Sequence, residues 1–375
     1  MILSSLELKN FRNYEHEIFN FDSSRNIILG KNAQGKSNLL EAIYYSCLTR
    51  SFRTRKDKEV IKFDNSFATI SGKFVLDSGQ QVNVIFYFTS DKGKQVSIDR
   101  KRVDKLSELI GKFPIVISSP EAYNLTSGAP TDRRKFLDIL LSQISNQYII
   151  NLQEYNKIIK QRNSILNRYN KDREKLERLI QPWDEYLIAK GSWIINFREA
   201  FLKKFELKLS EVHSHLTVPD EKIRLQYNST IDYNDLNEIH DGFEKKLAKI
   251  KKSEIEQGNT LIGPHRDDVL FYINERELRK YGSRGQHKTV LIALMISEFL
   301  IIKDKTKETP IILIDDLFSE IDHVREHKIL SYIIDLGQNF ISTTLNYNET
   351  TSFFKSKRAY LFEIEAGHIV KDEKI

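Results

Sequence analysis

The feature that most constrains this 375-residue chain is a glycine-rich run near its N-terminus. It reads Gly30-Lys31-Asn32-Ala33-Gln34-Gly35-Lys36-Ser37, which has the G-x-x-x-x-G-K-S spacing of a phosphate-binding P-loop. Residues 26–29 before it predict a strand and residues 38–43 after it predict a helix, the context that separates a P-loop from a chance glycine-rich turn. In such a loop Lys36 neutralises the β and γ phosphates and Ser37 offers its hydroxyl to Mg²⁺. We therefore expect ATP and Mg²⁺ as cofactors.

Composition sets broad limits on the function. The formal net charge is +6, a modest excess that favours acidic partners such as nucleic acid. The single cysteine, Cys47, cannot form an internal disulfide, which fits a reducing compartment. The most apolar window, residues 289–302, is shorter than the roughly 20 residues that cross a bilayer. We expect a cytoplasmic protein with no membrane segment.

The pattern of apolar residues divides the chain into three parts. Residues 1–119 predict strands around one helix and form the N-terminal part of an ATPase domain with the P-loop. Residues 120–257 predict a helical lobe inserted in that domain, with Pro182 separating two helices and no sustained heptad. Residues 258–375 return to alternating strands and helices and complete the ATPase domain. The expected fold class is α/β, with a P-loop ATPase domain split by a mainly helical lobe.

A second piece of the site is predicted where the apolar strand 311–314 ends in two acids. Asp315 would lie beside Ser37 and complete the metal shell, so these two residues are the expected metal ligands. Asp316 is placed to orient or deprotonate the attacking water, and Asp316 and Lys36 are the expected catalytic residues. The alternative is a solvated turn after a strand.

A third piece is the run Ser283-Arg284-Gly285-Gln286 at the start of an apolar helix. A hydroxyl, backbone N–H groups and the helix dipole make a second anion site there. One chain does not need two such sites for one triphosphate, but two chains facing each other do. We expect Ser283 of one subunit to cap the γ-phosphate held by its partner, in an ATP-dependent homodimer. Taken alone, the motif could equally be an ordinary helix N-cap.

The order of these motifs resembles the ABC-type ATPase head of the SMC group. In that pattern the run from Ser283 matches the signature motif, Asp315 the Walker B aspartate, and the D-loop includes Ser319 and Asp322. More narrowly, the chain resembles the RecF family of bacterial recombination mediators, through residues 8–14, 30–37, 50–53, 119–121, 132–138 and 263–268. The resemblance implies DNA binding at gaps or junctions, and help from RecO and RecR in loading RecA. It also implies roles in DNA replication, repair and the SOS response.

Several positions depart from the pattern or remain open. Asp316 stands where ABC transporters and most SMC heads have a glutamate, which favours a weak ATPase that acts as a switch. Thr343 and Thr344 replace the usual switch histidine, and Glu121 is the candidate for the Q-loop position. Arg12 is a candidate phosphate contact or a surface arginine. Residues 263–268 either contact nucleotide, DNA or the other subunit, or form a structural ion pair.

The expected DNA contacts lie in a basic stretch that follows the P-loop helix. Such a stretch can neutralise duplex phosphates without reading bases. The basic residues of the helical lobe are mixed with acids, which favours a solvated helix face there. The predicted DNA-binding residues are Arg50, Arg53, Arg55, Lys56 and Lys58.

The predicted function is an ATP-gated clamp on double- or single-stranded DNA. ATP joins two heads, the joined pair holds DNA, and hydrolysis releases it. The alternative is the ATPase subunit of a membrane ABC transporter, against which the helical lobe and residues 263–268 argue. A head of a double-strand-break complex would need a coiled-coil arm, and a small-molecule kinase has no use for the Ser283 motif.

Overall fold

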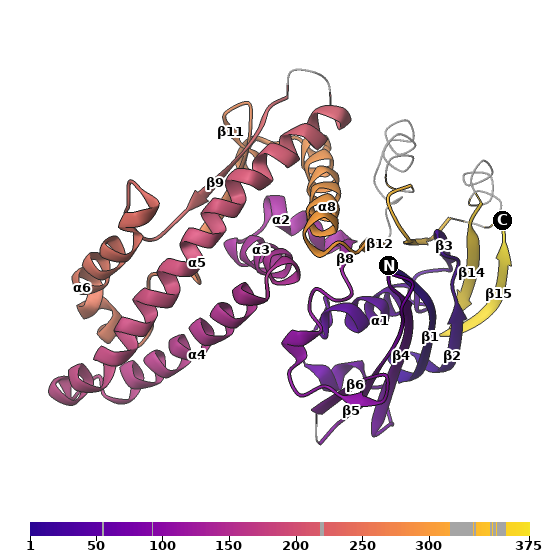
Figure 1. Cartoon of the computed structure of the whole chain (residues 1–375), viewed down its shortest axis with the longest axis horizontal. Coiled ribbons are helices and arrows are strands. Elements are labelled where there is room, and N and C mark those ends of the chain that lie inside the picture. Colours follow the sequence, from indigo (N-terminus) through magenta and orange to yellow (C-terminus); the bar gives the residue numbers. More distant parts are fainter. Residues whose placement is uncertain are drawn as a thin grey trace. The chain divides into compact units, whose positions relative to one another are not determined.

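The first strands of the chain alternate buried and exposed residues, whereas the strands beside the glycine-rich loop are buried throughout. The structure is a computed structural model that describes residues 1–54, 56–91, 93–217, 221–315, 335–345 and 358–375, with Ile333, Tyr347 and Thr350. Its backbone contacts divide the chain into two units, and Figure 1 labels the elements of both. The first unit is Met1–Ala122 with Leu294–Ile375, and the second is Tyr123–Ala293.

The alternating strands form an antiparallel six-stranded sheet in the order β2-β1-β4-β5-β6-β7. Alternating burial is what a sheet shows when one face packs on the core and the other faces water. The strands are β1 (Ile2–Phe11), β2 (Tyr14–Asn20), β4 (Phe67–Val75), β5 (Gln81–Thr89), β6 (Gly93–Ile98) and β7 (Lys101–Arg102). The 3₁₀ turns η1 (Asp57–Val60), η2 (Leu106–Glu108) and η3 (Pro120–Ala122) lie in the same unit.

The strands beside the glycine-rich loop belong to a second six-stranded sheet in the order β15-β14-β3-β13-β12-β8, in which only the mostly exposed edge strand β15 is antiparallel. Parallel strands place their carboxyl ends at one edge of a sheet. The ends of β3, β13 and β12 therefore meet there. The strands are β3 (Arg25–Leu29), β8 (Ile115–Ser118), β12 (Ile311–Ile314), β13 (Asn339–Thr343), β14 (Tyr360–Glu365) and β15 (His368–Lys374).

Helix α1 (Lys36–Leu48) contacts strands of both sheets. Its residues are buried around almost the whole circumference, as expected for a helix between two layers. Cys47 is among them, and burial raises the pKa of its thiol. The single cysteine of the chain is therefore a buried free thiol.

The second unit combines long helices with a small sheet. Helices α4 and α5 are joined by a short turn and pack along each other, with α6 against α5. The antiparallel sheet has the order β11-β10-β9. The elements are α2 (Tyr123–Ser127), α3 (Pro130–Ile144), α4 (Asn146–Arg168), α5 (Arg173–Leu216), β9 (Ile223–Asn228), η4 (Leu236–Glu238), α6 (Ile239–Gln257), β10 (Asp268–Ile273), β11 (Arg276–Glu277), α7 (Leu278–Tyr281) and the start of α8 (Arg284–Thr306).

A buried arginine ties this unit together. The Arg198 side chain is 2% exposed and donates to Asp138 at 2.7 Å, to the Tyr148 hydroxyl at 2.9 Å and to the Pro264 carbonyl at 2.6 Å. These partners come from α3, α4 and the turn before β10. A buried charge is tolerated only when it is paired and hydrogen-bonded, so Arg198 fixes how these elements pack.

Two sequence-based expectations for the lobe are wrong. Helix α5 runs through Pro182 without a break. Proline removes one backbone hydrogen bond to residue Arg178, and because both residues are exposed, water can solvate the freed carbonyl. The lobe also contains strand β9, whose alternating residues 223–228 were assigned to the helical region.

Backbone contacts continue across the second predicted boundary, after residue 257, which stays a prediction. Residues 258–293 belong to the second unit. They group with it because strand β10 pairs with β9 in an antiparallel manner. In addition, Arg133 of α3 donates two hydrogen bonds to the Asp268 carboxylate, at 2.7 and 2.8 Å. The signature run from Ser283 therefore belongs to the helical unit.

Among the described helices, α8 is the only one long and apolar enough to cross a membrane by length and composition. Of its apolar window, 61% is buried within the protein. A core helix passes the same test.

We predict that Arg198→Ala destabilises the second unit by about 3–5 kcal/mol, because it removes a buried guanidinium together with its ion pair to the half-buried Asp138 and its hydrogen bonds to Tyr148 and the Pro264 carbonyl. Urea unfolding measured by tryptophan fluorescence reports this unit, since both tryptophans, Trp183 and Trp193, lie on α5. The control Lys208→Ala removes an exposed ion pair on the same helix and should leave the unfolding midpoint in place. Equal stability of Arg198→Ala and wild type would contradict the structural role.

Candidate nucleotide-binding site

The glycine-rich loop joins the central strand β3 to helix α1, as the sequence predicts. Gly30 has φ +157° and Gly35 has φ +124°, values that side chains rarely adopt. A Cβ at Gly30 would lie 2.5 Å from the carbonyl oxygen of Ile364, and one at Gly35 would lie 2.8 Å from Asn13 Nδ2. The loop thus needs glycine at both ends for conformation and for space.

The loop is braced from both sides. Asn13 Nδ2 donates to the Gln34 carbonyl at 2.9 Å, and the Tyr14 hydroxyl donates to the Gly35 carbonyl at 3.0 Å. From the β14–β15 turn, the Gly367 amide donates to the Gln34 carbonyl at 2.9 Å and the Ala366 amide donates to Gln34 Oε1 at 2.6 Å. The loop is therefore fixed before any ligand binds, while Lys31, Asn32 and Ala33 at its crest are exposed.

Lys36 lies at the first position of α1, where its ammonium group closes over the loop. Its Nζ donates to the carbonyls of Gly30 and Lys31 at 2.6 and 2.9 Å. A helix N-terminus with a lysine held across the loop is the arrangement that binds phosphate oxygens. The structure places Lys36 where the sequence predicts it.

The structure brings Ser37 and Asp315 together, as predicted. The Ser37 hydroxyl donates to Asp315 Oδ1 at 3.1 Å, and the Ser342 hydroxyl at the end of β13 donates to the same oxygen at 2.6 Å. Hydroxyl and carboxylate oxygens are the ligands that Mg²⁺ prefers. These residues therefore fit a magnesium ion bound next to a phosphate.

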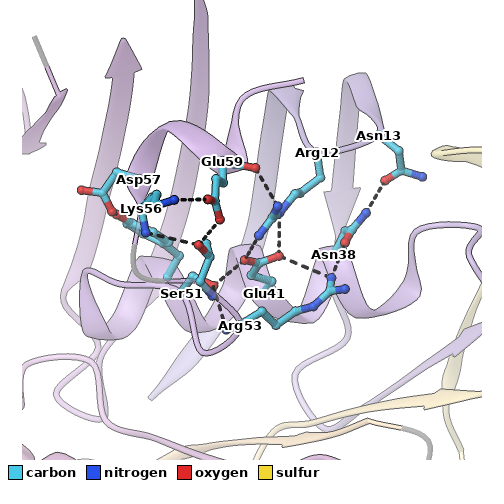
Figure 2. A network of polar contacts seen from close by, with 11 residues as sticks. Arg12, Asn13, Asn38, Glu41, Ser51, Arg53, Lys56, Asp57 and Glu59 are labelled. Atoms are coloured by element: carbon cyan, nitrogen blue, oxygen red, sulfur yellow. Dashed lines mark hydrogen bonds and ion pairs between the residues drawn. The ribbon is translucent and has the colours of Figure 1, made fainter. Parts of the chain in front are cut away.

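Arg12 turns to a carboxylate on α1 and not to the loop (Figure 2). Its guanidinium donates to Glu41 at 2.6 and 2.9 Å and to the Glu59 carbonyl at 2.6 Å. Because its Nε and both terminal nitrogens donate to these groups, the predicted phosphate contact of Arg12 has no support in this geometry. Its place in the site stays a prediction.

Glu41 also joins the basic stretch to the loop. The Ser51 hydroxyl donates to Glu41, and Arg53 lies 3.6 Å from it while donating to Asn38 Oδ1 at 2.7 Å. Asn38 in turn donates to Asn13 at 2.8 Å (Figure 2). The P-loop and the residues after α1 are thus parts of one polar network.

The signature run caps helix α8 in the second unit. The Gln286 amide donates to the Ser283 hydroxyl at 3.2 Å, and Gln286 Oε1 accepts from the Ser283 amide at 2.9 Å. This reciprocal pair is a capping box. Ser283 and Arg284 are exposed, and Gly285 is partly buried. Within the single chain, Ser283 is therefore the N-cap of α8. The start of this helix is exposed, so that another molecule can contact it.

Several predicted residues lie outside the described part of the chain. These are Arg55, Asp316, Ser319 and Asp322. At the position of the switch histidine, Thr343 is buried and its hydroxyl accepts from the Leu345 amide at 3.1 Å. Glu121 is exposed in η3, just after β8, which pairs with β12.

The basic stretch after α1 lies at the surface. Arg50, Arg53, Lys56 and Lys58 are exposed. Lys56 forms an ion pair with Glu59 at 3.4 Å, while the Lys58 ammonium group forms no hydrogen bond or ion pair with any described residue. The stretch can therefore reach a polyanion.

Residues 263–268 have a structural role within the second unit. Asp267 is 1% exposed and accepts hydrogen bonds from the Tyr227 hydroxyl and from the amide and hydroxyl of Thr230. His265 contacts the Tyr155 hydroxyl at 2.8 Å, and burial lowers the pKa of its imidazole to about 4. These contacts favour the structural alternative that the sequence left open.

Sequence reasoning missed the residues that support the site. Ser342 lies in a part of the chain predicted only as alternating strands and helices, and Glu41 is one acidic residue among the apolar residues of the predicted helix. Asn13 was part of a matched run, but nothing in that run shows that it bonds to Gln34. Each becomes significant only when distant segments lie together.

These features define a nucleotide-binding head of the ABC/SMC type, with a P-loop on a central parallel strand and a strand-end aspartate beside it. The family model of the RecF/RecN/SMC N-terminal domain matches residues 2–363. The chain belongs to this family and, within it, to the RecF family of DNA replication and repair proteins.

Relatives of full length support the narrower assignment. The DNA replication and repair protein RecF of Streptococcus gordonii is 40% identical over 98% of this chain and 100% of its own length. That of Bacillus subtilis is 34% identical over 99% of this chain and 100% of its own.

Solved structures agree. A structure of the recombination mediator protein RecF with ATPrS has a TM-score of 0.89 and 31% identity, covering 100% of this chain and 98% of the other. An Smc head bound to a domain of ScpA has a TM-score of 0.56 at 13% identity, covering 100% of this chain and 98% of the other, and shares the fold alone.

We predict that Gly30→Ala lowers affinity for ATP by about 5- to 150-fold, because a strained and crowded backbone costs about 1–3 kcal/mol. Titration with a fluorescent ATP analogue measures this. The matched control is Gly79→Ala, which also has a positive φ (+84°) but has nothing within 4 Å of the added Cβ. Unchanged affinity in Gly30→Ala would contradict the fixed loop described above.

Proposed function

We propose that this protein is an ATP-dependent DNA-binding protein of recombinational repair and replication, whose two copies join when ATP is bound. The observation that carries the proposal is the oxygen cluster of Ser37, Asp315 and Ser342 at the mouth of a fixed P-loop. The relatives named RecF and the structures of RecF with ATP and ATPrS support the same assignment.

ATP and Mg²⁺ are the proposed cofactors. Lys36 and the N-terminus of α1 would hold the phosphates, and Ser37 with Asp315 would hold the metal ion, which supplies charge neutralisation at the β and γ phosphates. Asp316, next along the chain, is the proposed water-orienting residue, and its short side chain favours slow hydrolysis. We propose a weak ATPase that acts as a switch.

The proposed dimer places the Ser283 helix start of one copy against the nucleotide of the other. Ser283 and Arg284 are exposed, and the backbone N–H groups at a helix start attract anions. The capping box gives α8 a defined first turn without covering it. The D-loop residues Ser319 and Asp322 are the proposed contacts between the two copies.

DNA is the proposed macromolecular ligand, in double- or single-stranded form and at gaps or junctions. Arg50, Arg53, Arg55, Lys56 and Lys58 would contact phosphates and not bases. By family resemblance, RecO and RecR are the proposed protein partners, RecA loading and the SOS response the wider role, and the cytoplasm the location. The transporter alternative has no support among the reported relatives.

We predict that ATP doubles the mass of the 44.0 kDa chain in light scattering, and that DNA strengthens this shift. Lys36→Met should abolish the shift because it removes the phosphate contact. Ser283→Arg should keep ATP binding in the isolated chain but block pairing, because a larger cation replaces the hydroxyl at the helix start. A Ser283→Arg chain that no longer binds ATP would make Ser283 a residue of its own copy's site and overturn the proposed arrangement.

We predict that Lys56→Ala together with Lys58→Ala lowers DNA affinity and flattens its salt dependence by about 0.9 per lost phosphate contact, or about 1.8 in total. Fluorescence anisotropy at several salt concentrations measures the slope. Lys208 is a partly exposed lysine of the second unit, and the control Lys208→Ala should leave the slope unchanged. The same slope in all three proteins would place the DNA site elsewhere.

A further inference from the structure

Phe63 is the most exposed large apolar side chain of the described residues, at 93%. The exposed apolar side chain next to it in rank is Leu207, at 73%. No ring contact involves Phe63 among the described aromatic residues. A single exposed apolar side chain is ordinary on a protein surface, so the significance of this ring depends on what surrounds it.

The backbone under Phe63 is held in place. On one side Ile61 bridges to Phe11, and the Lys62 amide donates to the Asn10 carbonyl at 2.8 Å. On the other side the Asn65 amide donates to the Lys62 carbonyl at 3.2 Å, and Asn65 Nδ2 donates to the Phe63 carbonyl at 3.1 Å. The ring therefore projects from a fixed turn, so little backbone freedom is lost when it meets a ligand.

The stretch that contains this turn has a net positive charge, although Asp64 follows Phe63 directly and Lys62 forms an ion pair with Glu15 at 3.4 Å. Residues 50–64 contain six lysines and arginines and three carboxylates. The carboxylates at Asp57 and Glu59 are already paired with Lys94 at 3.1 Å and Lys56 at 3.4 Å. Lys58 lies close to the turn, since the Ile61 amide donates to its carbonyl at 3.3 Å. An aromatic ring beside a basic stretch matches nucleic acid, where phosphates meet cations and bases stack on rings.

We propose that Phe63 stacks on an unpaired nucleobase and thereby favours DNA with a gap or a single-stranded region over continuous duplex. This rests on the proposed DNA-binding function and adds a source of structural preference to it. A base inside continuous duplex is already stacked on both faces and has no face to offer, whereas a base at a gap has one. The basic stretch would bind the backbone of any DNA, and Phe63 would respond only to exposed bases.

The test compares a single-stranded oligonucleotide, a gapped duplex and a closed circular plasmid, the last as competitor. Phe63→Ala should lower the affinity for the single-stranded oligonucleotide and for the gapped duplex by about 5- to 100-fold, the range that corresponds to losing one base–aromatic stack. Competition by the plasmid should stay unchanged. Phe63→Trp should restore binding. Leu207→Ala removes another exposed apolar side chain, from the second unit, and should leave the affinity for all three DNAs unchanged.

A direct readout uses gapped DNA with 5-iodouracil in the gap, irradiated and mapped by mass spectrometry. The cross-link should fall on Phe63 and disappear in Phe63→Ala. Equal loss of affinity for all three DNAs would mean that Phe63 only supports the basic stretch. Wild-type affinities in Phe63→Ala with altered self-association in light scattering would mean a protein contact. Either outcome overturns the stacking role.

The outcomes also separate this inference from the proposed function. A wild-type protein that binds none of the three DNAs would overturn the proposed function itself. A wild-type protein that binds all three, with a normal salt slope and no effect of Phe63→Ala, would overturn only the stacking role.

Discussion

The site depends on the ion pair that the buried carboxylate of Glu41 forms with Arg12. Glu41 has no exposed side-chain surface, and its partners come from the β1–β2 turn and from the stretch after α1. Removing the partner of a buried charge costs about 3–5 kcal/mol, so Arg12 and Glu41 fix α1 against the antiparallel sheet. Since α1 begins with Lys36 and Ser37, that ion pair also fixes the two side chains that would meet phosphate and metal. The bracing of the loop by Asn13 and Tyr14, which follow Arg12 in the chain, is a consequence of the same placement.

The second unit depends on a similar device in a different location. In this unit the buried charge with partners on several elements is Arg198. Arg162 of the same unit pairs with Glu254 at 2.6 Å and with Asp184 at 2.7 Å. Buried ion pairs add little net stability compared with apolar packing, but a misplaced partner is costly. We infer that they specify one arrangement of the helices. The run 263–268 contributes Asp267, Asp268 and the Pro264 carbonyl to these networks, which explains its residue types without any ligand.

The sequence predicted the loop, strand and helix start that carry the candidate site better than it predicted the elements of the lobe. The P-loop, the strand that ends at Asp315 and the helix start at Ser283 were all found because each needs particular residues at a fixed spacing within a few positions. The break at Pro182 was wrong because an exposed proline can be accommodated when tertiary packing holds the rest of the helix. Strand β9 was missed because six alternating residues beside long helices give a weak signal. The pairing of residues 223–228 with residues 268–273, across the predicted boundary at 257, could not be foreseen because strand pairing is non-local.

By itself, the sequence determined which chemical groups are present and where the backbone must turn sharply. Some requirements of the site are local: glycine at positions 30 and 35, lysine and serine directly after them, and an acid after an apolar strand. Local requirements can be recognised in the amino-acid sequence. Only the tertiary structure decided which groups meet. In the folded chain Ser342 donates to Asp315, Arg12 pairs with Glu41, and the side chain of Phe63 is exposed to water. Those outcomes depend on which strands pair and which charges find partners across hundreds of residues, and no short-range pattern encodes such pairings.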